Sequence, residues 1–241
     1  MKLYDEVINR WSGFLKDRST INLNINKQES WPDVGNHQMI LRGDMAYELG
    51  GSTPSVYAIG STAVTADESL VSADEIVLVG PDISEIKVDV SFARLTVVLV
   101  DSEAMGDGNA LYNAVKKINN VGYHVNPEGY MMRLSSVYGR ESIRISKPAI
   151  EKGLSFEHVG NLMLNELHKN PVVKAVKLVY VTDPSFDYKA ASAAAADAAS
   201  ITATIDHIMK DAMTDCNTCG LKKVCDEVEG LREMHFGRSK E

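Results

Sequence analysis

Residues 83–101 read ISEIKVDVSFARLTVVLVD, and this stretch decides the fold class. Between Ile86 and Phe92, apolar side chains alternate with polar ones, a pattern that predicts a half-buried strand. Residues 95–100 are nearly all apolar, so we expect a central strand that is buried on both faces. Together the two segments predict a domain built around a β-sheet.

The segments on either side continue this pattern. ADEIVLVGPD (73–82) predicts a short strand that stops at Gly80, AVKLVYVTD (175–183) predicts another, and residues 130–147 predict a pair of short strands. Helical spacing of apolar residues predicts helices over 109–120 and after Ser155, which can cap the second one. Because strands and helices do not alternate strictly, we predict an α+β fold with a mixed β-sheet and packed helices.

The two ends differ in character from this core. Residues 1–17 predict a helix and residues 18–38 a polar connecting arm, whereas residues 187–213 are rich in alanine and predict one long helix. That helix can lie on its own sheet or, as an alternative, against a second copy in a homodimer. We therefore predict four parts: an N-terminal helix and arm (1–40), a core (41–184), an Ala-rich helix (185–214) and a cysteine-rich tip (215–241).

Composition and charge limit the function classes. The chain has 241 residues and a formal net charge of −8, and this acidic balance argues against general nucleic-acid binding. It has no apolar run of the roughly 20 residues that span a bilayer. Its first residues lack the apolar core of a signal peptide, so we expect a cytoplasmic protein without a membrane partner.

All the cysteines of the chain lie in the tip, as Cys216, Cys219 and Cys225. An odd number of cysteines argues against a disulfide framework, and the compact Cys-x2-Cys-x5-Cys spacing predicts metal ligands. We expect a helix to begin at Asp226, which would hold Cys225 at a helix N-terminus as a thiolate. The first choice is an iron–sulfur cluster, as [4Fe-4S] with three cysteine ligands and a fourth ligand from elsewhere. Zinc completed by His235, or no metal at all, are the alternatives.

The core also resembles a known family. The segments that carry the resemblance are LRGDMAYELGGSTPSVYAI (41–59), DEIVLVGPDISEI (74–86), SIRISKPAIEKGLSFEHVGNLMLNELHKN (142–170) and VKLVYVTD (176–183). In this order they resemble the middle domain of acetyl-CoA synthase, the beta subunit of the carbon monoxide dehydrogenase/acetyl-CoA synthase complex. The resemblance implies partners such as a corrinoid protein, a methyltransferase or a synthase subunit. It also supports Cys216 and Cys219 as cluster ligands, whereas Cys225 rests on its spacing alone.

The resemblance has limits that bear on activity. The family forms acetyl-CoA at a nickel and iron–sulfur centre in a separate C-terminal domain, and it holds the nickel with Cys-Gly-Cys, a tripeptide that this sequence lacks. We therefore expect a stand-alone relative of the middle domain that does not make the carbon–carbon bond. Because the family's middle domain is linked to coenzyme A, a basic group is a candidate anion or coenzyme A site. Its members are Arg133, Arg140, Arg144 and Lys147.

Three functions follow from these observations. The first is an iron–sulfur accessory protein that transfers electrons or docks onto proteins of one-carbon metabolism. The second is an interaction module with a zinc knuckle, and the third is an enzyme acting on coenzyme A or a one-carbon unit through an open cluster iron. We assign no catalytic residue, because His124 and His158 have no carboxylate or cysteine partner nearby in sequence.

Overall fold

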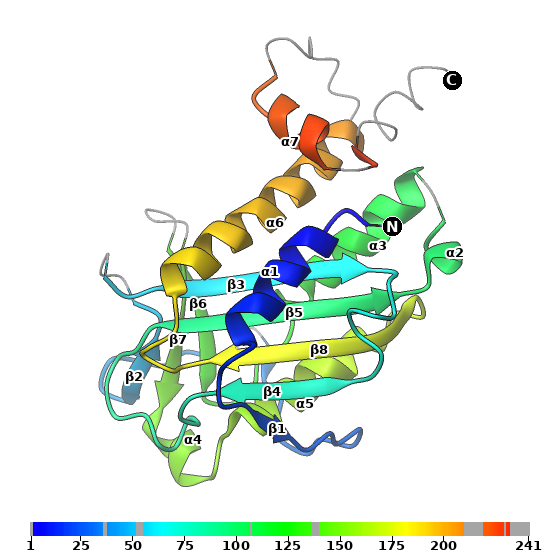
Figure 1. Ribbon diagram of the computed structural model, residues 1–241. Helices are drawn as coiled ribbons and strands as arrows, with labels where there is room; N and C mark the ends of the chain where they lie inside the picture. Colours follow the sequence, from blue (N-terminus) through cyan, green and yellow to red (C-terminus); the bar gives the residue numbers. More distant parts are fainter. Residues whose placement is uncertain are drawn as a thin grey trace.

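The described part of the chain forms an α+β domain with a mixed five-stranded sheet and a smaller second sheet (Figure 1). The computed structural model describes residues 2–35, 38–51, 55–106, 108–135, 140–209, 219–228 and 230–231. The predicted fold class is therefore confirmed. None of the helices in these ranges is long and apolar enough to cross a membrane.

The main sheet contains five strands in the order β1-β4-β8-β5-β3. Their bounds are β1 Ile21–Leu23, β4 Glu75–Val79, β8 Val173–Val181, β5 Phe92–Val100 and β3 Ala58–Thr65. The β4–β8 and β3–β5 pairs are parallel, and the β1–β4 and β5–β8 pairs are antiparallel. All nine residues of β5 are buried, which confirms the predicted central strand.

Helices cover both faces of this sheet. In Figure 1, α1 (Asp5–Leu15) and α6 (Tyr188–Met209) cross the front, while α3 (Gly108–Asn120) and α5 (Phe156–Leu167) lie behind. The Ser155 hydroxyl caps α5 by accepting the His158 N–H, as predicted. The long alanine-rich helix thus lies on its own sheet, which is the first of the two arrangements expected for it.

The second sheet is antiparallel and has the order β2-β7-β6. Its strands are β2 Met45–Leu49, β6 Tyr130–Ser135 and β7 Arg140–Ser146, so the predicted pair over 130–147 is confirmed. The remaining short elements are α2 (Ser102–Met105), η2 (Val121–Tyr123), α4 (Lys147–Glu151) and α7 (Lys222–Glu227).

The prediction of a half-buried strand between Ile86 and Phe92 is wrong. β5 begins only at Phe92, and the Val88 side chain is 67 % exposed. This segment is a loop that joins the two sheets: Val90 forms an isolated parallel bridge with Leu49, and the Tyr47 hydroxyl donates to the Ile83 carbonyl at 2.5 Å. Ile83 and Ile86 pack into the core while Val88 faces solvent, so the apolar alternation in this segment does not mark a strand.

The connecting arm also contains a strand that the sequence did not predict. β1 pairs antiparallel with the edge of β4, with Ile21 opposite Leu78 and Leu23 opposite Ile76. Residues 21–25 read INLNI and alternate apolar with polar residues, but the strand is short and two of its three residues are exposed, so the alternation does not report burial here. Its place is fixed by backbone hydrogen bonds to an edge that is available only in the folded sheet.

Candidate functional site

The cysteine-rich tip follows α6 and contains the short helix α7. Cys219 precedes this helix, and its carbonyl accepts the Lys222 N–H at 3.1 Å. Cys225 lies inside α7, where its N–H donates to the Leu221 carbonyl at 3.1 Å. Neither thiol is in a disulfide, and both are partly buried. Cys216 and His235 lie outside the described residues.

The helix expected to begin at Asp226 is wrongly placed. α7 begins at Lys222 and ends at Glu227, so Cys225 is its fourth residue and does not occupy an N-terminus. The reason is local charge pairing, because the Lys222 and Lys223 ammonium groups pair one turn ahead with the Asp226 and Glu227 carboxylates. These pairs favour a helix that includes the lysines.

The structure brings His207 of α6 to the tip. Its Nε2 lies 3.9 Å from the Cys219 Sγ, although twelve residues separate the two in sequence. Thiolate and imidazole are the donors that soft transition metals prefer. Cysteine spacing did not indicate His207, because this residue lies in the helix upstream of the thiol cluster. The usable signal was a histidine in the last turns of the helix that leads into the thiol cluster.

The distance between these donors bears on the kind of metal that fits them. Two donors of one tetrahedral zinc, with Zn–S near 2.3 Å and Zn–N near 2.05 Å, lie about 3.6 Å apart. The observed 3.9 Å between Cys219 Sγ and His207 Nε2 is close to that value. In an iron–sulfur cluster each ligand holds a different iron, so the donors lie further apart. Within the described ranges, no three His, Cys, Asp or Glu side chains gather closely enough to hold an ion by themselves.

The predicted basic group is partly neutralised by one carboxylate. The Arg133 Nη1 and the Arg144 Nε lie 2.8 Å and 2.9 Å from the same Glu48 oxygen. Lys147 donates its Nζ to the Gly43 carbonyl at 3.1 Å, and the Arg140 side chain lies outside the described residues. Glu48 lies on β2, which adjoins β7, so tertiary pairing supplied a counter-charge that sequence spacing did not show. An anion or coenzyme A site at these residues stays a prediction.

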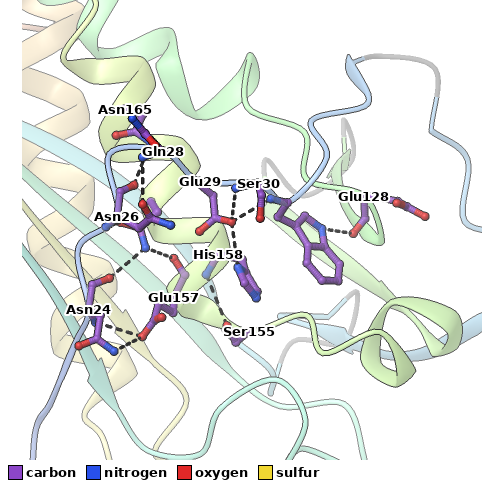
Figure 2. Close-up of polar contacts among 12 residues, drawn as sticks. Asn24, Asn26, Gln28, Glu29, Ser30, Glu128, Ser155, Glu157, His158 and Asn165 are labelled. Atoms are coloured by element: carbon purple, nitrogen blue, oxygen red, sulfur yellow. Dashed lines mark hydrogen bonds and ion pairs between the residues drawn. The ribbon is translucent and has the colours of Figure 1, made fainter.

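The arm is fastened to α5 by a polar network (Figure 2). The Glu157 carboxylate accepts the backbone and side-chain N–H groups of Asn24, both at 3.0 Å. The buried Glu29 carboxylate lies 3.1 Å from the His158 Nδ1, and Trp31 stacks on the same imidazole at 4.9 Å between ring centroids. Since Glu29 also accepts the N–H groups of Ser30 and Trp31, this carboxylate organises the turn of the arm. His158 thus has a carboxylate partner that sequence alone did not reveal, and its role is to hold the arm.

Two hollows open next to α6. One, of about 620 Å³, lies between α1, α6 and α7 and includes the Arg10–Asp197 ion pair. The other, of about 430 Å³, lies where α3, α6 and the edge strand β3 meet, and Arg94 of β5 reaches it. The second hollow was not indicated by any motif, because the residues that line it come from five separate segments.

The class of protein is thus an α+β domain with a mixed sheet, extended by a helix that carries a thiol tip. The chain belongs to the CO dehydrogenase/acetyl-CoA synthase complex beta subunit family, whose sequence profile matches residues 34–186. This match confirms the resemblance seen in the core segments. It covers strands β2 to β8 and α5, and it leaves α1, β1 with most of the arm, α6 and the thiol tip outside. No curated protein shows a significant match to the chain.

Proposed function

We propose that this protein is a metal-carrying accessory member of its family, with Cys216, Cys219 and Cys225 as ligands of an iron–sulfur cluster. The observation that supports the proposal most is the pair of partly buried thiols, neither in a disulfide, in a tip that follows α6 in a chain whose core belongs to an acetyl-CoA synthase complex family. Bound there, a cluster would supply one-electron transfer. The chain would serve electron transfer or docking beside corrinoid and one-carbon enzymes.

The residues of the tip fit this role chemically. Cys219 and Cys225 offer two sulfur donors close in sequence, one just before α7 and one inside it, and neither is in a disulfide. A third donor from Cys216 would complete the thiolate set typical of cluster sites. Because the sequence lacks Cys-Gly-Cys, we propose neither a nickel site nor synthesis of acetyl-CoA for this chain.

Anaerobic metal and sulfide analysis tests this proposal. We expect purified protein to contain iron and acid-labile sulfide in equal amounts, with a broad absorption band near 400 nm that bleaches on reduction. Cys219→Ala should lose most of both elements because one thiolate ligand is gone. Lys223→Ala is the matched control, since its exposed side chain lies in the same helix and offers no sulfur. Zinc without sulfide would contradict the cluster.

A zinc knuckle is the second candidate, and the separation of 3.9 Å between His207 Nε2 and Cys219 Sγ favours it. In this case His207 replaces His235 as the nitrogen ligand. His207→Gln would then remove a zinc ligand and lower the zinc affinity by at least the roughly tenfold that loss of an outer partner costs, whereas a cluster held by the three cysteines would keep its iron and sulfide in the same variant. The variant therefore separates the two metal centres.

A further inference from the structure

The hollow between α3, α6 and β3 has the features of a ligand site. β3 is an edge strand of the main sheet, and α3 and α6 contact each other beyond it. The volume of about 430 Å³ falls in the range of small-molecule pockets. Its main polar contributors come from four elements and are Thr62, Arg94, Tyr112, Lys116 and Asp206.

Arg94 is the unusual residue of this pocket. Its side chain is only 6 % exposed, and its Nε is buried without a hydrogen-bond acceptor among the described residues. None of the carboxylates in the described ranges forms an ion pair with it. A buried cation without a counter-charge is costly, and proteins pair such groups. Arg94 lines the pocket, so its guanidinium is placed to pair with an anion there.

The neighbours of Arg94 hold its guanidinium without neutralising it. Gly122 lies against it so closely that a Cβ there would be 2.5 Å from the arginine Nη2. Tyr180 is opposite Arg94 on β8, and although the arginine lowers its pKa, burial raises the pKa of its hydroxyl well above the ordinary value. The hydroxyl thus stays neutral and supplies no negative charge. On the other side, opposite Arg94 on β3, Gly60 presents no side chain to the pocket.

The rim adds positive charge, and the opposite wall is apolar. Lys116 is exposed and donates to the Tyr112 hydroxyl at 3.3 Å, while the Asp206 carboxylate is engaged by that same hydroxyl. Arg94 and Lys116 against Asp206 leave one net positive charge. The wall formed by α6 and α3 is lined by small and aliphatic side chains: Ala195, Ala199, Ala203, Ile205 and Val115.

We propose that this pocket binds a small anionic metabolite whose carboxylate or phosphate group pairs with Arg94 while a short apolar part lies along the alanine face of α6. Arg94 is the specificity-determining residue, because its fork of donors matches an oxyanion. Lys116 adds attraction at the entrance. This site is independent of the thiol tip and of any metal held there.

Isothermal titration calorimetry with simple probes tests the site. We expect the full-length protein to bind butyrate or inorganic phosphate and not to bind neutral butyramide. The probe that binds more tightly shows whether the ligand's anionic group is a carboxylate or a phosphate. Arg94→Met should weaken binding at least tenfold and Lys116→Met about threefold, in line with a loss of roughly 1.4 kcal/mol per factor of ten. Arg42→Met, which removes an exposed cation outside the pocket, should leave the affinity unchanged.

A stability measurement and a second variant test the site further. Because Arg94 has no ion-pair partner in the part of the chain that the structure describes, Arg94→Met leaves no carboxylate unpaired there and should melt at the same or a higher temperature than the parent protein. Ala199→Leu fills the pocket from an exposed position on α6 and should block the probes without altering Arg94. The proposal is overturned if neither anion binds at 50 mM, if Arg94→Met binds as well as the parent, or if Ala199→Leu leaves the affinity intact.

Discussion

At the residue scale, Asp183 joins three parts of the fold. Its carboxylate accepts the Arg18 Nη1 at 3.0 Å and both the N–H and the hydroxyl of Ser185 at 2.8 Å. Its backbone N–H donates to the Val79 carbonyl at 3.1 Å. Gly80 is required beside it, because a Cβ there would lie 2.4 Å from the Asp183 nitrogen and the φ of Gly80 is +103°. Asp183 therefore holds the end of α1 and the turn before α6 to the sheet.

The charge of Asp183 predicts a pH-dependent stability. Burial raises the pKa of Asp183, but hydrogen bonds from Ser185 and Arg18 outweigh burial and hold it below the ordinary value. A lowered folded-state pKa stabilises the protein above the unfolded pKa of about 3.9, and this contribution is lost as pH falls through the folded value. Asp183→Asn should lower the free energy of unfolding by about 1 to 2 kcal/mol at pH 7, with a smaller difference below pH of about 4.

Urea unfolding at several pH values measures this effect. Asp17→Asn is the matched control, since Asp17 is exposed and precedes the same arginine. An equal loss at pH 3 and pH 7 in Asp183→Asn would show that the carboxylate charge is not the cause.

At the element scale, the buried face of α6 allows close packing. Its buried face carries Ala191, Ala194 and Ala198 in the first half and isoleucines further on. The recurrence every three or four residues forms one stripe along the helix. Small side chains let the helix approach β3 and α1, whereas the larger isoleucines fill the wider space near its C-terminal end. The stripe explains why the helix packs on its own sheet.

Overfilling this stripe should destabilise the protein. Ala194 is fully buried, so Ala194→Leu forces α6 away from the sheet and should lower the free energy of unfolding by about 1 to 3 kcal/mol. Ala193→Leu, one position along on the exposed face, should change it by less than about 0.5 kcal/mol. Chemical denaturation measures both, and similar values for the two variants would contradict close packing of α6.

At the scale of the whole molecule, the core and the tip are stabilised differently. The hydrophobic core runs through α1, the sheets and α3, α5 and α6, and it is continuous. Within α7, by contrast, none of the residues is buried, and Cys225 only packs partly against the core. The chain returns to the core at Leu231, which is fully buried. The fold of the domain therefore does not depend on the thiols.

Metal removal should accordingly leave the domain folded. A chelator with a mild oxidant, followed by reduction of the released cysteines, should strip the tip and increase thiol alkylation. The far-ultraviolet circular dichroism and the melting temperature of the core should stay nearly constant, because the core buries its apolar surface without the metal. Cys219→Ala treated in the same way is the control. Cooperative unfolding on metal loss, as in zinc fingers, would show that the tip supports the whole fold.

The sequence by itself determined the segments whose apolar period reports burial: β4, β5, β8, α3, α5 and α6. It also determined the family, because the matched segments carry it in order. Tertiary structure alone decided that 86–91 is a loop, that β1 joins an edge, and that His207 reaches Cys219 and Glu29 reaches His158. The physical reason is that periodicity reports whether a segment is buried, whereas the segment that buries it comes from a distant part of the chain.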